Sequence, residues 1–131
     1  MLPKKYVPSS LSKSDKKKQI NMIRKSQRLY KKHVYYTRKK VSYRHKESKH
    51  IKKAKSMYDV STMVPSRELA KKTGCPVSAL KEIVRKGEGA YYSSGSRPNQ
   101  TPQSWGLARL ASAITGGPAS KVDAHILKRC H

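Results

Sequence analysis

The sequence has few acidic residues. It contains seven Asp and Glu residues and 31 Lys and Arg residues, which gives the 131-residue chain a formal net charge of +24. Two cysteines are too few for a disulfide scaffold, so we expect a reducing compartment and a buried, unpaired Cys75. No apolar run resembles a signal peptide or approaches the roughly 20 residues of a membrane-spanning helix. Phe is absent while Tyr occurs eight times, which favours polar, wet interfaces over a large dry core.

The positive charge is concentrated near the start of the chain. Residues 1–56 contain 20 Lys and Arg and only two acidic residues. Such a segment buries too little apolar surface to offset its conformational entropy. We therefore predict a basic arm, residues 1–60, that is ordered only against a polyanion or another protein, and a compact domain, residues 61–131. The arm residues expected to bind a partner are Lys16, Lys17, Lys18, Arg24, Lys31, Tyr35, Tyr36, Lys39 and Arg44.

Helical spacing of apolar residues predicts an all-α fold with a partly helical arm. In the arm, Ser12 or Ser14 should cap a helix that ends near Tyr30, and a Tyr-rich, extended connector should follow. In the domain, Ser66 should cap a helix that ends before Gly74, and Pro76 should open the next one. The expected helices cover residues 12–30, 46–58, 67–73, 76–86, 104–115 and 121–129.

The stretch Leu69 to Val84 has the spacing of a helix-turn-helix, with a turn residue at Gly74 and core residues on both sides. In that interpretation the second helix enters the major groove of DNA. Glu82 opposes it, because a carboxylate repels phosphates. The alternative is a helical hairpin that serves packing alone. The residues expected to face DNA are Ser78, Lys81 and Arg85.

The stretch from Gly87 to Gly117 is the least charged and least repetitive part of the chain. We expect the preceding helix to stop at Gly87 and an ordered Gly/Ser/Pro loop to cover residues 88–103. The expected anchors of this loop are Tyr91, Tyr92 and Trp105. Its serines have no histidine nearby in sequence to act as a base. We therefore expect no enzyme activity, and no catalytic, cofactor-binding or metal-binding residues.

The motif GAYYSSGSRPNQTPQSWGLARLASAITGG, followed by KVDAHIL, resembles an uncharacterised family of small basic proteins. These proteins are encoded by large icosahedral DNA viruses of algae and amoebae and by some phages. The resemblance covers about Ser66 to Leu127 and implies a viral source, without implying an activity.

Together these features lead us to expect a non-enzymatic structural component of a large DNA virus particle, a minor capsid or cement-type protein. Its basic arm would bridge neighbouring capsid proteins, the anionic inner membrane or the genome. The alternative is a viral DNA-binding protein that condenses or regulates the genome. We expect capsid proteins as partners, with nucleic acid or an anionic membrane surface as further candidates, and no small-molecule substrate. The expected location is the virion.

Overall fold

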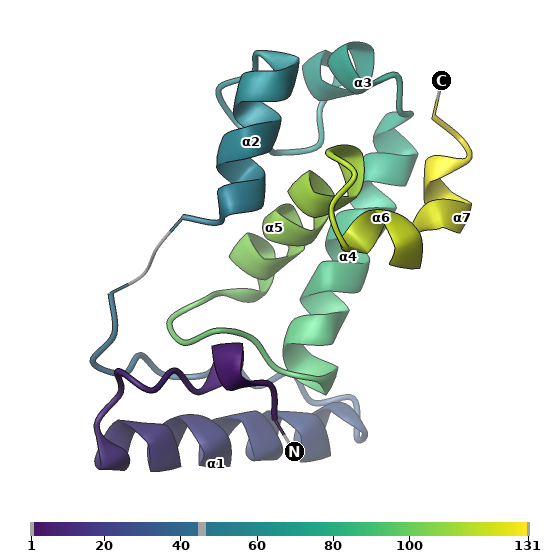
Figure 1. Ribbon diagram of the computed structural model, residues 1–131. Helices are drawn as coiled ribbons and strands as arrows, with labels where there is room; N and C mark the ends of the chain where they lie inside the picture. Colours follow the sequence, from purple (N-terminus) through teal and green to yellow (C-terminus); the bar gives the residue numbers. More distant parts are fainter. Residues whose placement is uncertain (1, 45–46, 131) are drawn as a thin grey trace. The chain divides into compact units, whose positions relative to one another are not determined.

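The computed structural model describes residues 2–44 and 47–130, and all regular structure in these ranges is helical (Figure 1). The all-α fold class is therefore confirmed. No helix within these ranges has the length and apolar character needed to cross a bilayer. The elements are the 3-10 helix η1 (Lys4–Tyr6) and the helices α1 (Lys13–Tyr30), α2 (Lys49–Tyr58), α3 (Arg67–Thr73), α4 (Val77–Ser93), α5 (Pro102–Ile114), α6 (Ala119–Val122) and α7 (Ala124–Leu127).

The chain divides into two compact units. We call Met1–Lys46 with Glu88–Pro102 the arm unit, and Glu47–Gly87 with Gln103–His131 the core unit. This division differs from the expected boundary at residues 60 and 61. Helix α2 belongs to the core unit, and the stretch 88–102 belongs with the basic N-terminal segment. The arm unit contains 17 Lys and Arg against two acidic residues, so most of the net charge lies there.

The core unit encloses an apolar cluster to which α2, α3, α4, α5 and α7 all contribute. The short α3 begins and ends where the sequence predicts. The hydroxyl of Ser66 accepts the backbone N–H of Leu69 at 3.1 Å, and Gly74 takes the left-handed conformation after the last turn. The buried residues of the cluster are Ala54, Met63, Leu69, Cys75, Ala79, Leu80, Ile83, Val84, Leu110, Ala111, Ala113, Ile114 and Ile126.

Helix α4 does not stop at Gly87, so that expectation was wrong. It continues through Gly89 to Ser93, and Tyr91 and Tyr92 are helical rather than part of a loop. Gly87 has a packing role. A Cβ atom at this position would lie 2.5 Å from the Cα of Gly106 on α5. The missing side chain thus lets α4 and α5 approach closely within the core unit.

The C-terminal segment also differs from the sequence prediction. Two short helices, α6 and α7, replace the single helix expected over residues 121–129. They meet at Asp123, which is fully buried and accepts two hydrogen bonds from Arg109, at 2.9 and 2.8 Å. This hydrogen bonding raises the pKa of Arg109 above its ordinary value. Val122, the last residue of α6, is 64% exposed.

The two cysteines form a disulfide, Cys75–Cys130, across a sequence separation of 55. The expectation of an unpaired Cys75 was therefore wrong, although its burial is confirmed. Two cysteines are too few for a scaffold, but they are enough for one bond when the fold places them together. The core unit does so, because it brings the C-terminal segment beside the turn between α3 and α4.

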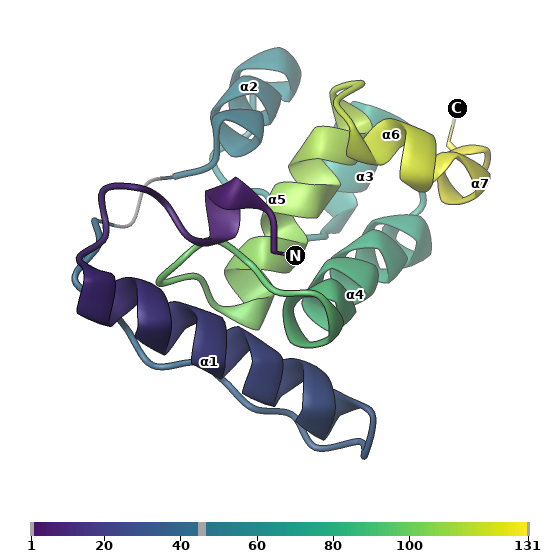
Figure 2. The same ribbon diagram turned by 60° about the horizontal axis from the view of Figure 1, so that its bottom comes forward.

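In the arm unit, α1 and the connector (residues 31–44) lie along each other in opposite directions, as both views show (Figures 1 and 2). Ser12 caps α1 as predicted, by accepting the backbone N–H of Asp15. The buried apolar and aromatic residues described in this unit include Tyr6, Leu11, Ile23, Val41 and Tyr91. Tyr6 and Ile23 lie beside Gly95 in the loop that follows α4.

Candidate nucleic-acid interface

Side chains of the basic N-terminal segment cap the C-terminal end of α4. The last carbonyl groups of a helix have no partner within it. Here the guanidinium of Arg38 donates to the carbonyl of Tyr91 at 2.9 Å, and the hydroxyl of Ser26 donates to that of Tyr92 at 3.0 Å. Just beyond the helix, the amide of Gln27 donates to the carbonyl of Ser94. The basic segment is therefore folded against residues 88–102 of its own chain.

Arg38 is the central contact of the arm unit. It is 9% exposed, and no carboxylate of the described residues pairs with it. A second guanidinium nitrogen donates to the hydroxyl of Ser96 at 2.6 Å, and the group lies 3.8 Å from the ring centroid of Tyr91. Burial lowers the pKa of Arg38. The negative end of the α4 dipole and the face of the ring offset the cost of burying its charge.

The loop after α4 holds the connector through one asparagine. The side-chain oxygen of Asn99 accepts the N–H of Val41 at 2.8 Å, and its nitrogen donates to the carbonyls of Val41 and Tyr43. Asn99 has a positive φ of 60°, which asparagine tolerates better than most residues. At the start of the loop, a Cβ atom on Gly95 would lie 3.0 Å from Ile23 on α1. The motif GSRPNQ thus positions α1 and the connector.

With its inner side held in this way, α1 presents a row of basic side chains to solvent. Lys17, Arg24 and Arg28 are exposed along one side of the helix, and Lys18 and Lys25 are exposed next to them. Between residues 13 and 44, no Lys or Arg forms an ion pair with a carboxylate of the described chain. The one acidic side chain of α1, Asp15, accepts the backbone N–H of Ser42.

The other predicted arm residues lie on the same unit. Lys16 and Tyr36 are half-buried, and the remaining ones in the connector are exposed, namely Lys31, Tyr35, Lys39 and Arg44. Sequence reasoning missed Arg38 and Asn99, because their partners lie more than 50 residues away in the chain. The available signal was the motif GSRPNQ, which we expected to form a self-contained loop.

Three tyrosines gather where α1 ends. The ring centroids of Tyr30 and Tyr92 are 6.1 Å apart with nearly parallel planes, and that of Tyr35 lies 6.0 Å from Tyr30 and 5.2 Å from Tyr92. We call these three residues the tyrosine cluster. Beside it, the ammonium of Lys25 lies 4.7 Å from the ring centroid of Tyr36. Aromatic and basic side chains are thus interleaved on the arm unit.

The predicted helix-turn-helix residues lie on the core unit. Ser78, Lys81 and Arg85 are all exposed on α4, while Ala79, Leu80, Ile83 and Val84 are buried. The carboxylate of Glu82 lies 3.6 Å from the guanidinium of Arg129. That ion pair offsets the charge that opposes DNA binding by this helix. Trp105, the third predicted anchor, is half-buried on α5.

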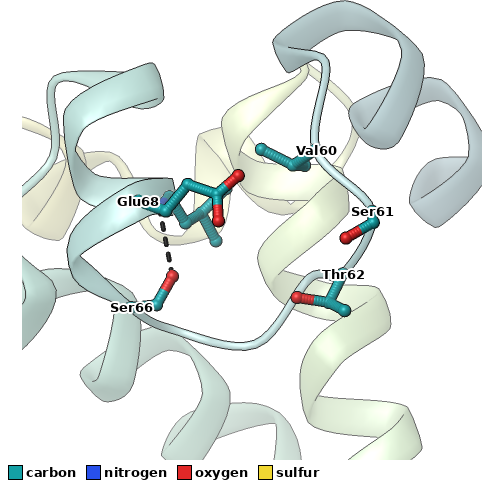
Figure 3. A pocket seen from close by; sticks show the side chains of 6 residues that line it. Val60, Ser61, Thr62, Ser66 and Glu68 are labelled. Carbon is teal, nitrogen blue, oxygen red and sulfur yellow. Dashed lines mark hydrogen bonds between the residues drawn. The ribbon is translucent and has the colours of Figure 1, made fainter.

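A small pocket lies where the chain enters α3 (Figure 3). Its lining carries one carboxylate, from Glu68, and three hydroxyls, from Ser61, Thr62 and Ser66. The hydroxyl of Ser66 is engaged in capping α3. The described residues also bring together no group of three His, Cys, Asp or Glu side chains suited to a metal ion. The arm unit therefore offers the better developed candidate site.

The fold and surface define a basic, all-helical protein whose arm unit combines exposed cations with clustered tyrosines. A family model described as a family of unknown function (DUF5824) matches residues 3–126, so the chain belongs to this family. The match covers both units, including the basic N-terminal segment. The search for similar curated proteins and the search for similar solved structures gave no match.

Proposed function

We propose that this protein is a non-enzymatic nucleic-acid-binding protein, and that the exposed face of α1 with the connector binds the phosphate backbone. The observation that carries the proposal is a row of exposed cations on a folded scaffold, none of which forms an ion pair with a carboxylate of the described residues. The row consists of Lys17, Lys18, Arg24, Lys25 and Arg28. Exposed cations that neutralise phosphates release counterions from the nucleic acid, which supplies a large, salt-dependent share of affinity. A preformed helix also avoids the cost of ordering the segment on binding.

A charge-neutralising variant of α1 tests this proposal. Lys17→Gln, Arg24→Gln and Arg28→Gln remove three positive charges while keeping good helix formers. The affinity for a fluorescent 20-nucleotide strand is measured by anisotropy at several salt concentrations. We expect at least about tenfold weaker binding at low salt. The slope of log K against log salt should become shallower by about two, because each neutralised phosphate contributes roughly 0.7 to this slope for a single strand.

The matched control removes three charges from the core unit, with Lys71→Gln, Lys81→Gln and Arg85→Gln. All three residues are exposed on α3 or α4. Because this variant loses the same net charge at another place, it shows whether weaker binding comes from the α1 surface or from the lower total charge. It also tests whether the helix-turn-helix residues bind DNA. Equal weakening by both variants would contradict an interface on α1. Greater weakening by the core-unit variant would favour the helix-turn-helix.

The place of the protein in a virus particle is a second proposal, and it depends on the resemblance of residues 66–127 to proteins of large DNA viruses. The high positive charge of the arm unit supports a location next to a packaged genome. Nuclease treatment of opened particles at moderate salt tests it. Release of the protein together with the genome supports the genome-bound role. Retention on emptied capsids would instead support the cement-type role predicted from the sequence.

A further inference from the structure

The tyrosine cluster of the arm unit has one strongly exposed member. Tyr35 is 65% exposed, although its ring packs against the rings of Tyr30 and Tyr92. The neighbouring Val34 is 48% exposed. The chain therefore keeps an aromatic ring and an apolar side chain in contact with water at one place on a highly charged surface.

The position of Tyr35 follows from the way α1 ends. The N–H of His33 donates to the carbonyl of Tyr30, and the N–H of Val34 donates to that of Leu29. This is the hydrogen-bond pattern of a Schellman motif. His33 takes the left-handed conformation that the motif requires, with a φ of 61°. The chain reverses there, which returns Tyr35 to Tyr30 in the last turn of the helix.

The cluster has a rigid base. The ring of Tyr92 meets that of the fully buried Tyr91 edge to face, with centroids 5.2 Å apart. Tyr91 is in turn held by Arg38, whose backbone N–H donates to the Tyr91 hydroxyl at 3.0 Å. The hydrogen bond from Ser26 to the carbonyl of Tyr92 fixes the backbone of the same turn. The exposed tyrosine therefore rests on side chains that are fixed before any ligand arrives.

The positive charge around the tyrosine cluster limits the kinds of ligand that the cluster can bind. Lys31, Lys32 and Arg28 are exposed close to Tyr30 in sequence, and no carboxylate within residues 2–44 and 47–130 forms an ion pair with them. A cationic ligand, which an aromatic cage would otherwise suit, is repelled by this surface. A ligand with flat aromatic groups joined by a chain of anions fits both features. Unpaired bases on a phosphate backbone have this composition.

We infer that the tyrosine cluster stacks on unpaired bases and that the arm unit therefore prefers single-stranded nucleic acid to duplex. In a duplex the bases are stacked on one another and present no free face, whereas in a single strand each base has one available. This inference rests on the proposed function and names the form of nucleic acid that the same surface binds. Tyr35 would provide the stacking face, and the cations of α1 would hold the backbone.

The test compares the intact protein with Tyr35→Leu and Tyr35→Trp, using a 20-nucleotide strand and the duplex of the same sequence at one salt concentration. We expect the wild type to bind the strand at least about tenfold more tightly. Tyr35→Leu should weaken strand binding by about tenfold and leave duplex binding within about twofold. Tyr35→Trp should bind the strand as the wild type does. Val122→Ala, at an exposed valine of the core unit, is the control and should change neither affinity.

The outcomes separate the inference from the proposed function. If strand and duplex bind equally and Tyr35→Leu has no effect, the inference is overturned, while salt-dependent binding would still support the role of α1. If the wild type binds neither form, both are overturned. A further binding experiment uses phosphatidylserine vesicles. If Tyr35→Leu weakens binding to the vesicles but leaves binding to the strand unchanged, the cluster is a membrane contact and the inference is overturned.

Discussion

Arg38 and Tyr91 contact each other in three ways. The guanidinium of Arg38 lies 3.8 Å from the ring centroid of Tyr91, it donates to the Tyr91 carbonyl at 2.9 Å, and the backbone N–H of Arg38 donates to the Tyr91 hydroxyl at 3.0 Å. These contacts join the connector to the end of α4 across a separation of 53 residues. They make the basic N-terminal segment part of a folded unit.

Arg38→Lys should destabilise the arm unit although it keeps the charge. The single ammonium of lysine cannot reproduce the two bonds of the guanidinium, to the carbonyl of Tyr91 and the hydroxyl of Ser96. We expect the free energy of opening of the arm unit to fall by about 1.5–3 kcal/mol, as measured by amide hydrogen exchange of residues 19–30. Lys39→Arg, at the exposed next position, is the control and should have no effect. Unchanged exchange in Arg38→Lys would contradict the central role of Arg38.

Asn99→Asp should loosen the connector. The replacement keeps the shape of the side chain but removes the donor that serves the carbonyls of Val41 and Tyr43. A carboxylate would then face two carbonyl oxygens, at a cost of about 1–3 kcal/mol in the free energy of unfolding. Asn99→Gly keeps the left-handed backbone without the side chain and should cost less. Denaturant unfolding compares the two, and the reverse order would contradict this role of the Asn99 amide.

Two glycines of α4 should respond oppositely to alanine. Gly87→Ala places a methyl group 2.5 Å from the Cα of Gly106, so we expect destabilisation of about 1–3 kcal/mol. At Gly89 the nearest atom would be the Tyr30 hydroxyl at 3.5 Å, an ordinary contact. Gly89→Ala should therefore stabilise the helix by up to about 1 kcal/mol. Thermal unfolding measures both. Destabilisation by Gly89→Ala would show that residue 89 is not in a helix.

Reduction of the disulfide should destabilise the core unit. The bond between Cys75 and Cys130 closes a long loop of the chain. Its loss should lower the free energy of unfolding of the core unit by about 2–4 kcal/mol. We expect a reductant to lower the melting temperature of the wild type but not that of the Cys75→Ser, Cys130→Ser double variant. Equal melting temperatures of the wild type with and without reductant would contradict a stabilising disulfide.

The fragment of residues 1–60 should show little helix by circular dichroism in dilute buffer. The sequence already predicts this result from charge repulsion along residues 13–30. The structure adds a second reason, because the fragment lacks the loop and the end of α4 that hold Ser26 and Arg38. Substantial helix in the fragment would show that α1 does not need residues 88–102.

Local signals in the sequence were enough to predict several elements. Ser12 and Ser66 cap helices that begin where expected, and Gly74 ends α3, because each of these depends on neighbours within one turn. The exposed side of α4, with Ser78, Lys81 and Arg85, also followed from helical spacing.

Features that depend on distant partners could not be predicted in this way. Gly87 has the signature of a helix stop, and only the approach of α5 shows that it is a packing position. Arg38 is one of 31 basic residues, and nothing in its immediate sequence marks it as buried. The tyrosine cluster likewise joins residues 30 and 35 to residue 92, which only the fold brings together.

The central claim is that the arm unit binds nucleic acid through α1 and the connector. The most direct test is an amide chemical-shift map of the intact protein during titration with a 20-nucleotide single strand. We predict the largest shifts at residues 17–28 and 31–36, and small shifts at Ser78, Lys81 and Arg85. Shifts concentrated on those α4 residues, or no shifts at all, would contradict the claim.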